Sequence, residues 1–434
     1  MGKIRVGEPV LNGRQLTCKV STTEGLEKYL NDSELFIEYD TDVVNDPSIL
    51  NIPLTATILP LAWLTGSDVI VGALDKTFKH SMDKLQKLFK EMFPLAKFTT
   101  EIKAKELVDN KIKVFDPERR TGLLFSGGVD STYSLIKNLE KKPRLIMHWG
   151  VDNFLYPDRN DHWEKTISTY KEFAEKNNLA FNLVKTNISQ ILDDRRIEHR
   201  FHGELYDGKL RFALQHSLVL LPLVAPLSMN KFDALIIAAS DTPQWDYVIR
   251  PRAAKPSTDE LIIWGDLKVE HHGYISRNEK IKTIADYQRD NDLILRVCLR
   301  STLTDGNFND STCEKCLRTI ASLALMGVDP NSCGFKVDES TFNLMRSFWV
   351  NRKTSLLAPV WRELQALIPN GIDNDFNGSK NFFEWFKDFD FESAEKTWFY
   401  TDLYMALPYK LASLLDVIYR KLGINVHENP RQRL

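Results

Sequence analysis

Hydrophobic and polar positions change their spacing several times along the chain, and each change predicts a different element. Early in the chain, positions 35–39 partly alternate and positions 68–71 are apolar, so both are expected to be strands. Apolar residues recur at helical spacing over 78–92, which predicts an amphipathic helix with its lysines in solvent. Residues 51–63 are apolar but contain two prolines, so an irregular buried segment is expected there.

Farther along, between about residues 120 and 298, strand-like runs alternate with helical patterns. The apolar runs predict strands at residues 123–125, 144–147, 181–184 and 234–239. Helical patterns are found at residues 135–139, 162–177 and 210–221, and a proline-punctuated loop at 250–264. This alternation is typical of an α/β fold with a doubly wound, mostly parallel sheet. Ligands of such sheets bind beyond the carboxyl ends of the strands. Polar or small residues occupy three of these predicted ends, at 126–131, 148–152 and 240–241.

The patterns divide the chain into three predicted parts. Residues 1–117 are expected to form an N-terminal α+β domain for structural support, dimerisation or partner docking. Residues 118–335 would form the central α/β domain, which includes the cysteine cluster. Residues 336–434 are predicted to be a helical C-terminal extension rich in aromatic residues. Most of those aromatic side chains are expected in a core, and the remainder could dock a protein partner.

Composition places the chain among ordinary soluble globular proteins. Its 434 residues are 43% hydrophobic and 27% charged, and the length allows two or three domains. With 57 basic and 59 acidic residues the net charge is −2, so nucleic-acid binding is not expected from overall charge. We find no uninterrupted apolar run of 18 residues and no signal-peptide pattern. A cytoplasmic protein without a membrane partner is therefore expected.

The most informative stretch is SGGVDS, which lies between a strand-like run and a helical pattern. It consists of Ser126, Gly127, Gly128, Val129, Asp130 and Ser131. Strand, glycine-rich turn and helix N-terminus together bind phosphate, because free backbone N–H groups and the helix dipole favour an anion. Asp130 would orient the loop, cap the helix or hold Mg²⁺. A tight turn with serine caps is the alternative interpretation.

Downstream, Ser276 and Glu279 have the spacing of a capping box and predict a helix that begins at residue 277. Arg277 and Lys280 therefore fall in a first helical turn, where the helix dipole does not favour cations. A phosphate ligand would explain them, and so would simple exposure to solvent. Both explanations remain open at the level of sequence.

Four of the five cysteines lie between residues 298 and 333, and only Cys18 stands apart. Cys313 and Cys316 form a CxxC, which supplies two zinc ligands from one tight turn. Cys298 would be a third ligand, and the fourth would be Asp310, Cys333 or absent. In a cytosolic chain such clustering favours a metal over disulfides. Reduced thiols without a metal are the alternative, and a redox CxxC fits the surrounding pattern less well.

These motifs together resemble the PP-loop ATP pyrophosphatase superfamily and, within it, the 7-cyano-7-deazaguanine synthase branch. SGGVDS resembles the nucleotide loop of the superfamily, residues 277–280 resemble a lysine-bearing segment, and residues 298 and 313–318 resemble the zinc segment. The resemblance covers residues 120–325. The chain departs from the family at Asp310, where a fourth cysteine would fall, and in its two extensions. Longer relatives with such extensions occur in bacterial anti-phage defence operons, and the chain is more similar to those.

The resemblance implies an adenine nucleotide alpha-hydrolase-like fold and an ATP-dependent ligase. Such an enzyme would adenylate a carboxylate, here a deazaguanine acid, release pyrophosphate and pass the acyl group to an amine or ammonia. The SGGVDS loop would bind the phosphates, and Asp130, Lys280 and Arg277 would form the catalytic set. Adenosine would lie near Gly150, Val151 and Asp152, and the substrate near Asp241 and His202. The implied cofactors are ATP, Mg²⁺ and Zn²⁺, the last held by Cys298, Asp310, Cys313 and Cys316.

Two other functions remain open. One is tRNA modification by a PP-loop enzyme through an adenylated base, which the absence of net positive charge disfavours. The other is a non-catalytic ATP-binding scaffold in a defence complex, which the extra domains and the incomplete cysteine set leave open. A protein substrate or a defence-operon partner would fit the extensions. We expect the residues that decide the substrate to lie in the 200–275 region and the flanking domains.

Overall fold

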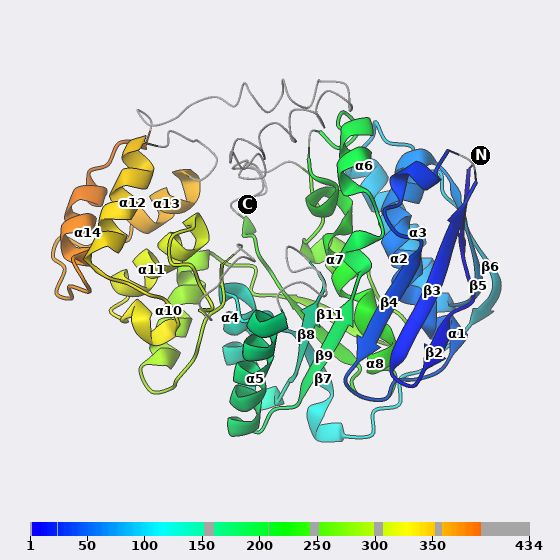
Figure 1. Ribbon diagram of the computed structural model, residues 1–434, viewed down its shortest axis with the longest axis horizontal. Helices are drawn as coiled ribbons and strands as arrows, with labels where there is room; N and C mark the ends of the chain where they lie inside the picture. The colour runs from blue at the N-terminus through cyan, green and yellow to red at the C-terminus, as the bar shows by residue number, and fades with distance from the viewer. Residues whose placement is uncertain are drawn as a thin grey trace. The chain divides into compact units, whose positions relative to one another are not determined.

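The computed structural model describes residues 2–23, 25–151, 160–206, 208–243, 251–298, 307–351 and 358–391. By their internal contacts the residues form two compact units, whose elements are labelled in Figure 1. The first unit comprises Met1–Ser126 and Ser134–Ile275, and the second comprises Gly127–Tyr133 and Ser276–Leu434. This division differs from the three predicted parts, because the N-terminal strands share a sheet with the central ones.

That sheet has eleven strands and is the framework of the first unit. Its order is β11-β10-β7-β8-β9-β4-β3-β1-β5-β6, with β2 paired to β3. The central strands are β7 (Thr121–Leu124), β8 (Arg144–Trp149), β9 (Phe181–Thr186), β10 (Ala234–Ala238) and β11 (Lys268–His272). All neighbouring pairs among these five are parallel. The chain runs from β7 to β9 in one direction and places β10 and β11 on the other side of β7. The prediction of an α/β fold with a mostly parallel sheet is therefore confirmed.

The N-terminal strands continue the same sheet on the far side of β9. They are β1 (Lys3–Val6), β2 (Val10–Asn12), β3 (Gln15–Thr22), β4 (Glu34–Tyr39), β5 (Asp68–Asp75) and β6 (Ile102–Val108). The strands predicted at 35–39 and 68–71 are confirmed as β4 and β5. Antiparallel pairing of β4 with β9 sets Ile37 opposite Thr186. Just beyond β4, the Asp40 carboxylate accepts hydrogen bonds from the Asn182 side chain and the Leu183 N–H.

Helices and short helical turns complete the first unit. They include α1 (Pro47–Leu50), α2 (Ile52–Thr65), α3 (Lys76–Met92), α5 (Asn160–Lys176), α6 (Asp194–Arg200), the π-helix η5 (Arg211–Gln215), α7 (His216–Leu220), α8 (Ala225–Ser228) and α9 (Pro256–Asp259). Helical structure near 78–92, 162–177 and 210–221 was expected and is confirmed. The loop expected over 250–264 contains α9, and its first residue lies outside the described residues.

Helix α2 corrects the expectation of an irregular segment over 51–63. Pro53 lies in the first turn of α2, where its missing N–H costs no hydrogen bond. Pro60 lies inside the helix, yet every residue from Ile52 to Leu64 is buried. The helix continues through Pro60 because the free energy gained by this burial outweighs the loss of the one backbone hydrogen bond that Pro60 removes.

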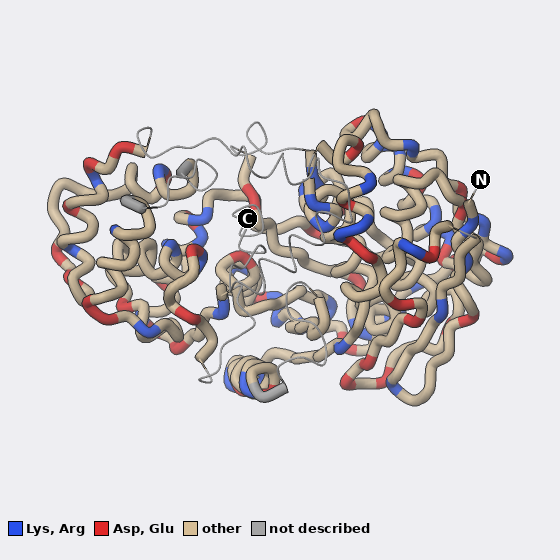
Figure 2. The backbone as a smooth tube through the Cα atoms, turned by 45° about the horizontal axis from the view of Figure 1, so that its top comes forward, with Lys and Arg blue, Asp and Glu red and all other residues tan. Residues whose placement is uncertain are grey.

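Two helical stretches, Pro47–Thr65 and Arg211–Ser228, are long and apolar enough by length and composition to cross a membrane. Both are mostly buried inside the fold, as core helices of soluble proteins are. Figure 2 shows basic and acidic residues intermixed along the described chain. The first unit is therefore organised as a soluble α/β protein.

The second unit is helical. It contains the first turn of α4 (Val129–Lys137), then α10 (Arg277–Gln288), α11 (Glu314–Leu325), α12 (Glu339–Asn351), α13 (Ala358–Gln365) and α14 (Ser379–Lys387). Helix α10 packs on α11, and α12 packs on α14. The expectation of an aromatic core is confirmed for Trp349, Trp361, Phe382, Phe383 and Phe386, all buried. Trp398, Phe399 and Tyr400 lie outside the described residues.

If the N-terminal strands and the central sheet unfold together, truncation of a core side chain in β4 must destabilise both sets of strands. Ile37 is fully buried, so Ile37→Ala is expected to lower the free energy of unfolding by about 3 kcal/mol. Backbone amide hydrogen exchange should then become faster in β7–β10 as well as in β1–β6. The exposed Val10→Ala is the control, with little expected change. Faster exchange confined to residues 1–117 would contradict a single unit.

Candidate functional site

The SGGVDS loop makes a turn between β7 and the start of α4. It follows β7, and Gly127 has a φ of 75°, a left-handed conformation that glycine adopts without strain. The Gly127 carbonyl accepts a hydrogen bond from the Arg296 N–H at 2.7 Å, which holds the turn. Helix α4 then begins at Val129, and Ser131 donates its hydroxyl to the Gly128 carbonyl at 3.3 Å. As at any helix start, the first backbone N–H groups of α4 lack partners within the helix.

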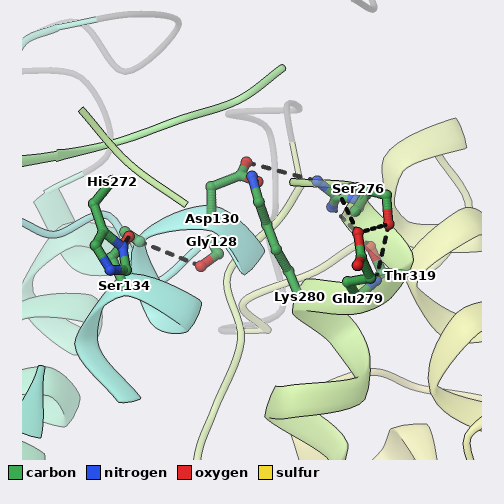
Figure 3. A network of polar contacts seen from close by, with 10 residues as sticks. Gly128, Asp130, Ser134, His272, Ser276, Glu279, Lys280 and Thr319 are labelled. Atoms are coloured by element: carbon green, nitrogen blue, oxygen red, sulfur yellow. Dashed lines mark hydrogen bonds and ion pairs between the residues drawn. The ribbon is translucent and has the colours of Figure 1, made fainter. Parts of the chain in front are cut away.

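Asp130, in the first turn of α4, is the centre of a charged cluster (Figure 3). The Lys280 ammonium donates to Asp130 Oδ1 at 2.8 Å. The Arg277 guanidinium lies 3.7 Å from Oδ2 of the same carboxylate. Both cations come from the first turn of α10, about 150 residues later in the chain. The structure therefore brings together the three residues that sequence reasoning assigned to catalysis.

The start of α10 explains how the two cations are held. Ser276 and Glu279 form the predicted capping box, in which each side chain accepts from the other residue's backbone N–H. Arg277 also donates to Thr319 Oγ1 at 3.2 Å. Lys280 is only 1% exposed, so simple exposure to solvent does not explain it. That alternative is wrong for Lys280, and an ionic partner is what its burial requires.

The cations control the ionisation of the loop carboxylate. Burial disfavours the charged form of Asp130, but Lys280 and Arg277 outweigh burial and hold the pKa of Asp130 below its usual value. Burial lowers the pKa of Arg277 to about 10, which leaves the guanidinium charged at neutral pH. Asp130 and Arg277 are therefore both ionised near pH 7.

Two further cations of the second unit were missed by sequence reasoning. Lys315 and Arg318 lie on α11, and both interact electrostatically with Arg277, which places all three close together. Arg318 pairs with the buried Glu314 at 3.1 Å. Glu314 also accepts from the indole N–H of Trp361, which ties α13 to α11. The only signal in the sequence was the position of Lys315 between two candidate metal ligands.

The cysteine cluster is a candidate metal centre. Cys298, Asp310, Cys313 and Cys316 each place a ligand atom within 4.8 Å of the other three. The Sγ atom of Cys313 lies 3.9 Å from that of Cys298 and 3.4 Å from that of Cys316. Zinc–sulfur bonds at tetrahedral angles place sulfurs about 3.8 Å apart. The donor set thus fits a metal ion such as zinc.

Asp310 takes the fourth position in this cluster, and Cys333 does not belong to it. One Asp310 oxygen accepts from the N–H groups of Thr312 and Cys313, both at 2.8 Å, which orients the carboxylate. The hydrogen bond with Cys313 raises the pKa of Cys298 to about 12, and burial raises the pKa of Cys316 strongly. Metal binding would therefore have to displace thiol protons.

The remaining predicted residues belong to the first unit and are not in the charged cluster. Gly150 and the buried Val151 follow β8, and Asp152 lies outside the described residues. Asp241 follows β10 and pairs with Arg252 at 2.6 Å. His202 follows α6 and is half-buried.

No family model, no curated protein and no solved structure matches the chain. The geometry of the chain itself must therefore carry the functional conclusion. It defines an α/β protein with a glycine-rich loop, a cationic cluster around one loop carboxylate and a cluster of three cysteines and an aspartate.

The cysteine cluster predicts a specific pattern of zinc content. Purified protein is expected to bind zinc stoichiometrically, and Cys316→Ser should reduce the affinity at least about tenfold because it removes one thiolate. Cys333→Ser is the matched control, a buried cysteine outside the cluster that should leave the zinc content unchanged. Elemental analysis and competition with a chelator measure both. Equal zinc loss in the two variants would contradict the assignment.

Gly150 has a structural explanation that can be separated from any role near adenosine. Its φ is 107°, and an added Cβ would overlap the carbonyl oxygen of Thr186 in β9. Gly150→Ala is therefore expected to lower the free energy of unfolding by about 2 kcal/mol or more. Denaturant unfolding measures this. Gly203→Ala is the control, because a Cβ added there would have no atom of the described residues within 4 Å.

Proposed function

We propose that the chain is an ATP-dependent ligase of the 7-cyano-7-deazaguanine synthase type, with an adenine nucleotide alpha-hydrolase-like fold. The observation that carries this proposal is the pairing of the loop carboxylate Asp130 with the buried Lys280 and with Arg277. A capped turn that needs no ligand would not require a buried lysine and a half-buried arginine beside it. A loop that handles polyphosphate does require them, because phosphate oxygens carry charge that only fixed cations and N–H groups neutralise.

In the proposed first step, a carboxylate oxygen of the substrate attacks the α-phosphorus of ATP. The bond from the α-phosphorus to the bridging oxygen breaks, and pyrophosphate leaves with that electron pair. The ammonium of Lys280 has three N–H donors and gives one of them to Asp130, so the same group could also donate to a phosphate oxygen. Arg277 would add a second positive charge, and Asp130 would hold both cations in place.

In the proposed second step, ammonia or another amine attacks the acyl carbon of the adenylate. The bond from that carbon to the phosphate oxygen breaks, AMP leaves, and the amine loses a proton as the amide forms. A deazaguanine acid is the carboxylate that the resemblance implies. The chain's contribution is to hold the two reactants together and to stabilise the charge that develops on the phosphates.

Mg²⁺, when bound with ATP, would screen the phosphate charge and polarise the phosphorus. Asp130 already contacts two cations, which supports its orienting role over direct binding of Mg²⁺. Zinc, when bound by the three cysteines and Asp310, would hold the start of α11 and with it Lys315. The proposed role of zinc is therefore structural.

Removal of the Lys280 ammonium is the direct test of this function. Lys280→Met is expected to slow pyrophosphate release about a hundredfold or more, because it deletes one fixed charge beside the loop. Lys282→Met is the matched control, an exposed lysine on the same helix that should keep full activity. The assay supplies ATP, Mg²⁺, a deazaguanine carboxylate and ammonia.

Circular dichroism of both variants must match that of the parent, since loss of Lys280 leaves Asp130 with one fewer partner. If folded Lys280→Met releases pyrophosphate at the parental rate, the proposed role of the cluster is wrong. If the parent binds ATP without releasing pyrophosphate, a non-catalytic nucleotide-binding scaffold replaces the ligase.

A further inference from the structure

One short segment, residues 295–298, connects the two candidate sites of the second unit. The Arg296 N–H donates to the Gly127 carbonyl of the SGGVDS loop at 2.7 Å. Two residues later, Cys298 contributes its sulfur to the cysteine cluster. Two residues of chain span at most about 7 Å, so the loop contact and the metal ligand cannot move far independently of each other.

The side chain of Asn309 holds this segment. Its Oδ1 accepts from the N–H groups of Val297 at 2.9 Å and Cys298 at 3.2 Å. Its Nδ2 donates to the carbonyls of Leu295 at 2.8 Å and Gly334 at 2.9 Å. A side-chain amide has two acceptor positions and two N–H donors, so these four bonds use all of them. Asn309 is only 2% exposed, and loss of its amide would leave these four backbone groups without that partner.

Asn309 is also joined to the cysteine cluster through the chain itself. The next residue is Asp310, the fourth candidate ligand, whose carboxylate is oriented by the N–H groups of Thr312 and Cys313. Asn309 therefore contacts one ligand, Cys298, through its side chain and adjoins another, Asp310, in sequence. A metal ion that draws these two ligands to one point would fix the position of Asn309 as well.

An asparagine that only braces a turn makes a different set of contacts. Asn331, in the same unit, accepts from the Val337 N–H at 2.9 Å and donates to the Val337 carbonyl at 3.3 Å. It also donates to Asp329, so these side-chain bonds lie within residues 329–337. Asn309 instead joins parts of the chain that no short turn connects.

We infer that Asn309 is a positioning residue that couples metal binding at the cysteine cluster to the conformation of the SGGVDS loop. The metal fixes two ligands beside Asn309, and Asn309 holds residues 295–298 in place. The Arg296 N–H then holds the Gly127 carbonyl, which sets the turn of the loop. The inference deepens the proposed function and rests on it for the ligand of the loop, ATP. Because coupling between two sites is reciprocal, zinc and ATP raise each other's affinity by the same factor.

Amide hydrogen exchange of the full chain without ATP tests the step from metal to loop. Zinc added to the metal-free protein is expected to slow exchange over residues 127–131 and 295–298 about fivefold or more. Helix α14, in the same unit, is the internal control and should exchange at an unchanged rate. No effect of zinc on the loop, or an equal effect on α14, would overturn the inference.

Two variants of Asn309 separate coupling from packing. Asn309→Ala keeps all four candidate ligands and should still bind zinc, but zinc should no longer slow exchange of the loop. Asn309→Asp keeps an acceptor for Val297 and Cys298 but loses both N–H donors, so its zinc effect should lie between zero and the parental one. Asn331→Ala is the matched control and should behave as the parent does. A zinc effect of parental size in either folded Asn309 variant would contradict the role of Asn309.

Competition with a chelator, with and without ATP and Mg²⁺, tests the reciprocal effect at matched free zinc. ATP is expected to tighten zinc binding about fivefold or more in the parent, and Asn309→Ala should abolish that gain. Equal zinc affinity with and without bound ATP would overturn the coupling. If the parent binds no ATP, the proposed function fails, while the exchange experiment still decides this inference. If ATP binds and pyrophosphate is released but zinc leaves the loop unchanged, the inference fails alone.

Discussion

The contact between the Asp130 carboxylate and the Lys280 ammonium is the interaction on which the second unit depends. Lys280 is buried, so loss of Asp130 would leave its charge without compensation and would be strongly destabilising. The pair also joins a loop near residue 130 to a helix near residue 280, which no local preference of the chain would bring together. A requirement for both charges in one place is the physical reason to regard this loop as more than a turn.

Other contacts of the second unit fix the helix that carries Lys280. The capping box of Ser276 and Glu279 defines the start of α10, and α10 packs on α11. The start of α11 is in turn set by Cys313 and Cys316, whose sulfurs lie 3.4 Å apart. Glu314 connects α11 to α13 through Trp361. Helix α13 is thus tied to α11, and α12 packs on α14.

Much of the central sheet could be predicted from sequence, because β7, β8 and β10 are buried runs of apolar residues with a clear signal. Strand β6 was missed because most of its residues are exposed or half-buried. Helix α2 was predicted to be irregular because its two prolines disfavour a helix, and the complete burial that stabilises it is not visible in the sequence. The joining of β4 to β9 could not be foreseen, since it pairs residues about 150 positions apart.

In the candidate site, the sequence predicted which residues carry the chemistry better than it predicted which of them are buried and what packs against them. Asp130, Lys280 and the cluster with Asp310 were chosen from motif and spacing, and the structure brings each set together. Burial of Lys280 was undetermined, because a capping box predicts a helix start but not which face is covered. Lys315 was missed for a related reason: the spacing of Cys313 and Cys316 predicts metal ligands, but not that α11 packs on α10 and brings Lys315 close to Arg277.

The most direct test of the central claim measures whether a labelled oxygen atom passes from the substrate carboxylate to AMP. A deazaguanine carboxylate labelled with heavy oxygen is incubated with ATP, ammonia and the protein, and the AMP produced is analysed by mass spectrometry. Attack of the carboxylate on the α-phosphorus predicts one labelled oxygen in AMP, because the acyl–oxygen bond breaks in the second step. AMP without label, or ADP and phosphate as the products, would contradict the account.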